Sequence, residues 1–116
     1  MHELALMGDI LSLVEKDVKE RNFTKVNQIH LIVGDLSNAM PDALEMAFEI
    51  YRASGIPFLT EDSKLVIERE EAKARCVLCN EEYIPDQRLA LCPHCGMPTG
   101  KIISGETLQV RSYEGS

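Results

Sequence analysis

The four cysteines of this sequence form two Cys-x-x-Cys pairs with twelve residues between them: Cys76, Cys79, Cys92 and Cys95. Each pair can close a tight turn that directs two thiolates at one ion, and structural Zn²⁺ prefers a closed tetrahedral set of such ligands. Asn80 follows the first pair and Gly96 follows the second. Both residue types tolerate the left-handed backbone that such turns require. The spacing therefore predicts a structural zinc site made of all four cysteines.

The same four thiols allow other chemistry. Two disulfides would suit a secreted protein, although nothing in the sequence indicates secretion. An iron site of rubredoxin type uses the same ligands and would make the protein an electron carrier, because thiolates bind both metals. His94 lies inside the second pair, where it could replace a thiolate, add a ligand or be a solvated residue of the turn. A zinc ribbon can also bind nucleic acid, and the charge balance bears on that possibility.

The chain is acidic. Its 116 residues include 19 Asp and Glu against 12 Lys and Arg, for a net charge of −7. Proteins that bind nucleic acid cluster cations that neutralise phosphates, and no such basic run occurs here, so we expect no nucleic-acid partner. The N-terminus lacks the cationic segment of a signal peptide, and no apolar window is long enough to span a membrane. We expect a cytoplasmic protein with reduced thiols and no membrane partner.

Apolar periodicity predicts two helices and three strands. In chain order these are a helix over 3–20, a strand over 25–33, a helix over 41–53, a strand centred on 65–67 and a returning strand over 102–112. Pro41 suits the first turn of the second helix, and Gly55 follows its end. Gly105 is expected to supply a turn or bulge in the returning strand.

This order of elements indicates an α+β fold. The strand–helix–strand unit favours a right-handed parallel crossover. We therefore expect a small mixed three-stranded sheet with two helices on one face. Residues 1–71 and 101–116 should form an α/β domain, and residues 72–100 should form an inserted, projecting zinc-ribbon module built on the four cysteines.

The first three residues, Met1-His2-Glu3, offer a second set of metal donors. Removal of an initial methionine normally needs a small second residue, so Met1 should be retained before His2. The Met1 amine, the His2 backbone amide and His2 Nδ1 could then close two chelate rings around one ion. A deprotonated amide is a strong planar-field donor, so this set suits square-planar Ni²⁺ or Cu²⁺. The alternative is a disordered terminus with no metal.

Motifs along the whole chain resemble those of the HypA family, the nickel metallochaperones of NiFe-hydrogenase maturation. Met1-His2-Glu3-Leu4 opens the first helix, Gly34-Asp35-Leu36-Ser37 follows the first strand, and the second cysteine pair occurs as Cys92-Pro93-His94-Cys95-Gly96. The N-terminal motif combined with two cysteine pairs is more specific than either half alone. The chain departs from the family at Ala5, where Ser is frequent, and at Thr107, where Glu is common.

The resemblance implies that His2 binds nickel, with the Met1 backbone amine and the adjacent Glu3 near it, and that the four cysteines hold structural zinc. It also implies two partners, a HypB-type GTPase and the NiFe-hydrogenase large subunit that receives the nickel. We expect no enzyme, because the sequence has no phosphate loop, nucleophile elbow or Cys–His pair outside the zinc cluster. His30 is expected to be a structural histidine. The alternative function is a zinc- or iron-ribbon module for protein interaction or electron transfer.

Overall fold

The computed structural model describes residues 2–85 and 91–116, which divide into two compact units. We call the first the helical unit, comprising Met1–Ile32, Ala39–Glu68 and Gln109–Ser116. The second, the cysteine unit, comprises Val33–Asn38 and Arg69–Leu108. The predicted inserted module over 72–100 lies within the cysteine unit, which also takes in flanking residues on both sides. No helix among the described residues combines the length and the hydropathy needed to cross a membrane.

Two helices supply most of the core of the helical unit. The helices α1 (His2–Glu20) and α2 (Pro41–Ala53) each bury one apolar face, as expected for the predicted amphipathic helices. Pro41 occupies the first turn of α2, and Gly55 takes φ +82° just beyond the end of α2, so both boundaries follow from local sequence. The buried side chains are Met7, Ile10, Leu11, Val14 and Val18 from α1, and Leu44, Ala47 and Phe48 from α2.

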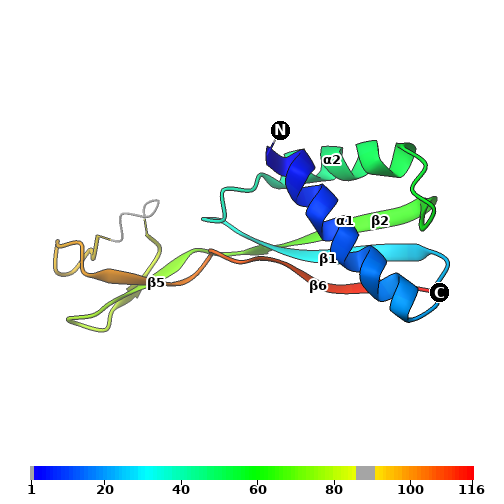
Figure 1. The fold of residues 1–116 in the computed structure, drawn as a ribbon. Helices are drawn as coiled ribbons and strands as arrows, with labels where there is room; N and C mark the ends of the chain where they lie inside the picture. Colours follow the sequence, from blue (N-terminus) through cyan, green and yellow to red (C-terminus); the bar gives the residue numbers. More distant parts are fainter. Residues whose placement is uncertain (1, 86–90) are drawn as a thin grey trace. The chain divides into compact units, whose positions relative to one another are not determined.

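The predicted mixed sheet is present, with its strands in the order β2-β1-β6. These strands are β1 (Val26–Gly34), β2 (Leu59–Glu70) and β6 (Leu108–Gly115). The β1 and β2 strands are parallel. Val26 N donates to Phe58 O at 2.8 Å where both strands begin, and Asp35 N donates to Glu70 O at 3.0 Å where both end. The β6 strand runs antiparallel to β1, since the backbones of Lys25 and Ser116 hydrogen-bond to each other in both directions. The two helices lie on one face of this sheet (Figure 1).

A second sheet, which the sequence did not predict, forms within the cysteine unit. Its order is β4-β3-β5, from β3 (Lys73–Cys76), β4 (Glu82–Tyr83) and β5 (Gly100–Ser104). The prediction of one returning strand over 102–112 was wrong, because β5 and β6 belong to different sheets. Gly105 separates them with φ +106°, and a Cβ there would lie 2.6 Å from the Ala72 Cα. Only glycine fits this turn without moving the backbone.

Candidate metal sites

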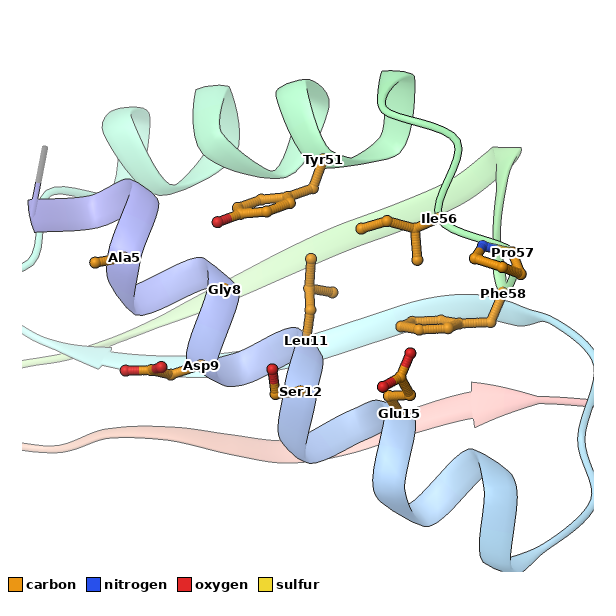
Figure 2. A pocket seen from close by; sticks show the side chains of 10 residues that line it. All are labelled: Ala5, Gly8, Asp9, Leu11, Ser12, Glu15, Tyr51, Ile56, Pro57 and Phe58. Carbon is orange, nitrogen blue, oxygen red and sulfur yellow. The ribbon is translucent and has the colours of Figure 1, made fainter.

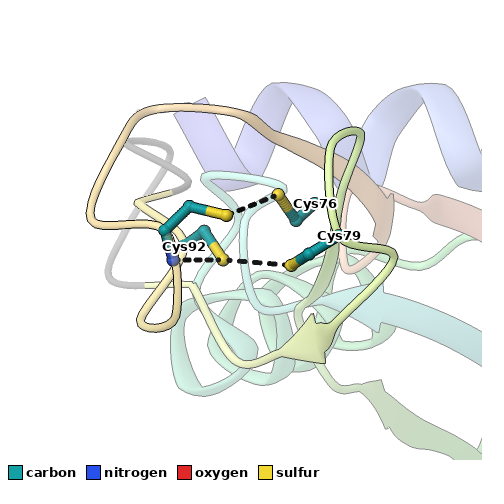
Figure 3. A group of neighbouring side chains, drawn as sticks. Cys76, Cys79 and Cys92 are labelled. Carbon is teal, nitrogen blue, oxygen red and sulfur yellow. Dashed lines mark hydrogen bonds between the residues drawn. The ribbon is translucent and has the colours of Figure 1, made fainter.

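The four cysteine sulfurs form one compact group, shown in part in Figure 3. All four Sγ atoms lie within 4.8 Å of one another, and the Cys76–Cys95 and Cys79–Cys92 separations are both 3.8 Å. A tetrahedral zinc site with bonds of about 2.3 Å has sulfur–sulfur edges of about 3.8 Å. A disulfide needs about 2.0 Å, and all four cysteines are free. The donor set and its spacing therefore fit a structural zinc ion.

Two matching turns present these sulfurs. Asn80 donates its backbone N–H to Cys76 O at 2.9 Å, and Gly96 donates to Cys92 O at 2.7 Å. Asn80 takes φ +61° and Gly96 takes φ +66°, which confirms the left-handed backbone predicted for both. In each turn a backbone N–H also points at the leading sulfur: Leu78 N lies 3.4 Å from Cys76 Sγ, and Cys95 N lies 3.3 Å from Cys92 Sγ. The Leu78 N–H is one of the donors that lower the pKa of the Cys76 thiol, and this favours the thiolate that binds metal.

Thr99 is a supporting residue that sequence reasoning missed. Its Oγ1 lies 3.0 Å from Cys76 Sγ. The pKa of the Cys76 thiol is lowered to about 6, and the Thr99 hydroxyl is the largest cause, ahead of the backbone N–H groups of Cys79 and Leu78. The Thr99 carbonyl also accepts from Val77 N at 2.9 Å. Its position brings it to the cysteine. Thr99 immediately precedes β5, and the pairing of β3 with β5 sets the next residue, Gly100, opposite Cys76.

Replacing Thr99 with valine should lower zinc affinity about 10- to 100-fold, the usual cost of losing an outer-shell partner. The valine keeps the shape of the side chain but cannot donate to the Cys76 thiolate. Competition with a chromogenic chelator would measure the change. A Thr60→Val variant, which alters a hydroxyl in the helical unit, is the control and should leave zinc affinity unchanged. Equal affinity in the Thr99 variant and the wild type would contradict this role.

His94 and His30 contribute no ligand atom to the sulfur group in the described part of the chain. His94 is exposed between Cys92 and Cys95. His30 is half-buried, and its Nε2 lies 3.4 Å from Glu68 Oε1. These positions fit a solvated turn residue and a structural histidine.

The predicted nickel ligands lie at the start of α1. Met1, with its amine, lies outside the described residues. His2 is the first residue of the helix and is exposed. Glu3 is half-buried, and its Oε2 accepts from Met40 N at 3.3 Å. The Glu3 carboxylate is therefore bound to the N-terminus of α2, a contact that the sequence did not indicate.

A hollow of about 510 Å³ lies along α1 between Ala5 and Glu15, as Figure 2 shows. Gly8 and Leu11 line it from α1, Tyr51 from α2, and Phe58 from the residue preceding β2. The Tyr51 hydroxyl donates to Leu4 O at 3.1 Å, so the wall of the hollow is hydrogen-bonded to the first turn of α1.

Glu70 organises the turn that contains Thr107. Its Oε1 accepts from Gly105 N at 2.7 Å and from Thr107 N at 3.4 Å. The Gly105 bond is the largest cause of a lowered pKa for the Glu70 carboxyl. The Glu70 carboxylate, at the end of β2, therefore binds the backbone of this turn, in which position 107 carries Thr.

Known proteins are similar to this chain along nearly its whole length. The family described as "Hydrogenase/urease nickel incorporation, metallochaperone, hypA" matches residues 1–115. The hydrogenase maturation factor HypA of Moorella thermoacetica is 36% identical over 115 residues, covering 99% of each chain. HypA of Aquifex aeolicus is 32% identical over 114 residues, covering 98% of this chain and 96% of its own.

Two solved structures share the fold. The solution structure of a HypA protein aligns with a TM-score of 0.69 and 22% identity, covering 100% of this chain and 97% of the other. The solution structure of the nickel metallochaperone HypA from Helicobacter pylori aligns with a TM-score of 0.65 and 21% identity, covering 97% and 96%. The likeness in fold and the full-length sequence match lead to one conclusion. The chain belongs to the HypA family of hydrogenase and urease nickel-incorporation metallochaperones.

Proposed function

We propose that this protein binds Ni²⁺ at its N-terminus and delivers the ion to the NiFe-hydrogenase large subunit during maturation. The observation that carries the proposal is the match to the nickel-incorporation family over residues 1–115, a range that includes Met1-His2-Glu3. The ion is cargo in this role and the chain is its carrier, so we assign no catalytic residue. A HypB-type GTPase is the proposed partner that drives the transfer.

The proposed nickel ligands are the Met1 amine, the His2 amide nitrogen and His2 Nδ1. The helix α1 begins at His2, and the first four N–H groups of an α-helix have no acceptor within the helix. Nickel can therefore bind the His2 amide without breaking a helical hydrogen bond. The exposed position of His2 leaves the bound ion accessible to a recipient.

This ligand set suits an ion that must be released. Coordination removes protons from the amine and the amide and needs a neutral imidazole, so nickel affinity falls as the pH drops. The Glu3 Oε2 accepts from the Met40 N–H, which holds the carboxylate at the N-terminus of α2. We therefore place Glu3 beside the three nitrogen ligands and not among them.

The second proposed metal is a structural Zn²⁺ held by Cys76, Cys79, Cys92 and Cys95. Four thiolates close the coordination of the ion and leave no open position for transfer, which separates this site from the nickel site. Four free thiols fit a reducing compartment, and we propose a cytoplasmic location.

A transfer assay tests the delivery step. The nickel-loaded protein is mixed with nickel-free hydrogenase large subunit, with or without the HypB-type GTPase and GTP, and the nickel content of the separated large subunit is measured. We expect more transfer than from a small-molecule nickel chelate of matched affinity, and a further increase with the GTPase and GTP. Equal loading from the chelate would contradict a carrier role.

A further inference from the structure

A tyrosine on α2 reaches the turn of α1 that carries the proposed nickel ligands. Tyr51 is half-buried, and its hydroxyl donates to the Leu4 carbonyl at 3.1 Å. Figure 2 shows its ring extending from α2 toward the part of α1 that holds Ala5 and Gly8. Leu4 is two residues from His2, so this bond fixes the backbone beside the proposed site.

Gly8 gives the tyrosine the space for this contact. A Cβ at position 8 would lie 2.7 Å from Tyr51 Oη and 3.5 Å from Cζ, so the hydroxyl would have to move away from Leu4. Glycine inside a helix lowers helix stability relative to alanine, and one kept there commonly has a packing reason. Gly8 is not among the glycines with positive φ, so the reason here is space.

A second contact from α2 holds the same turn. Met40 N donates to Glu3 Oε2 at 3.3 Å, so α2 binds a side chain and a backbone carbonyl of neighbouring residues. The first turn of a helix otherwise frays, because its leading N–H groups lack helical partners and chain termini are weakly ordered. These two contacts counter fraying at the end of α1 that carries His2.

We propose that Tyr51, seated against Gly8, is a positioning residue for the N-terminal nickel site. The inference rests on the proposed nickel function of His2. The Tyr51 hydroxyl acts through the Leu4 carbonyl, which keeps the first turn helical and the His2 amide and imidazole in one arrangement. A ligand set ordered before the ion arrives loses less conformational entropy on binding.

The first test is nickel titration of Tyr51→Phe by calorimetry. The variant keeps the ring and loses the bond to Leu4, and we expect about 3- to 10-fold weaker nickel binding, as for loss of one neutral hydrogen bond. In the nickel-free protein, the ¹³Cα shifts of Glu3, Leu4 and Ala5 should move toward random-coil values. Unchanged nickel affinity would overturn the inference, whether or not the shifts move.

Gly8→Ala completes a double-mutant cycle with Tyr51→Phe. Alone, it displaces the hydroxyl and should weaken nickel binding by a similar factor. In the double variant the close Oη contact is gone, and alanine favours the helix, so thermal stability should recover relative to Gly8→Ala. Nickel affinity should be no lower than in either single variant, because both changes remove the same bond. Fully additive losses in affinity would overturn the inference.

Tyr113→Phe is the matched control. The Tyr113 hydroxyl donates to Asp17, near the other end of α1, so this variant removes an equivalent tyrosine contact far along the helix from His2. We expect its nickel affinity to equal that of the wild type; an equal loss would mean general loosening of α1 and would overturn the inference. His2→Ala tests the proposed nickel function separately from the positioning role of Tyr51. If it abolishes binding while Tyr51→Phe does not weaken it, the proposed function stands and the positioning role falls.

Discussion

Replacing His2 with alanine should weaken nickel binding by at least about 100-fold, beyond the 10- to 100-fold cost of losing an outer-shell partner. The change removes the imidazole and leaves the amine and amide with one chelate ring in place of two. Calorimetric titration of Ni²⁺ into the zinc-loaded protein would measure the loss, and the absorption of planar nickel should disappear with it. Nickel binding that survives in this variant would sink the N-terminal site.

Two controls sharpen that result. His30→Ala removes a histidine of the same unit whose Nε2 lies 3.4 Å from Glu68, and nickel affinity should not change. A Gly-Ser extension before Met1 keeps every native side chain but moves the amine away from the chelate, and affinity should fall. An extended protein that binds nickel as tightly as the wild type would remove the Met1 amine from the ligand set.

Replacing Cys92 with serine should unfold the cysteine unit. Structural zinc contributes about 10–16 kcal/mol of apparent folding free energy in zinc-finger peptides at neutral pH. Between Arg69 and Leu108 the unit has little else to bury among its described residues. Its buried hydrophobic side chains there are Ala72, Ala74, Cys76 and Cys92, and two of these are metal ligands.

Metal analysis and amide exchange would check this outcome. We expect zinc content to fall from one equivalent to nearly none and exchange protection to disappear from β3 and β5, while α1 and α2 stay protected. Val77→Ser is the control, because Val77 lies between two of the metal ligands, Cys76 and Cys79, but its side chain is 66% exposed. Full zinc content with unchanged protection in Cys92→Ser would contradict a structural role. A visible iron–thiolate spectrum from protein made without added metal would instead favour electron transfer.

The helices were the most predictable part of the fold. The structure has α1 over His2–Glu20 and α2 over Pro41–Ala53, within one residue of the predicted bounds, because apolar periodicity and terminal Pro and Gly are local signals. The sheet of the cysteine unit was missed for the opposite reason. The β3 strand alternates in burial, but it has only four residues and its two buried side chains, Ala74 and Cys76, are small. So short a pattern of small residues is a weak signal for a strand.

The residues of the candidate sites also differ in how well the sequence predicts them. The cysteine pairs and Met1-His2-Glu3 are visible because their donors are close in sequence. Thr99 and Tyr51 act on residues 23 and 47 positions away, and Met40 acts on a side chain 37 positions away. No local pattern marks such partners, since each depends on which strands or helices become neighbours.

The division of the chain into units has a consequence for protein engineering. Gly34 donates to Thr107 O, Leu36 donates to Gly105 O, and Asp35 binds Arg69 through two hydrogen bonds of 2.5 and 2.8 Å. The segment Val33–Asn38 thus belongs to the cysteine unit although 30 residues of other structure separate it from Arg69. A graft of residues 72–100 into another scaffold would carry none of these contacts. It would also leave Ala72 N without Asp35 and β3 without most of β5. A transplantable cassette must carry both segments, and a sequence exchange between relatives must replace both together.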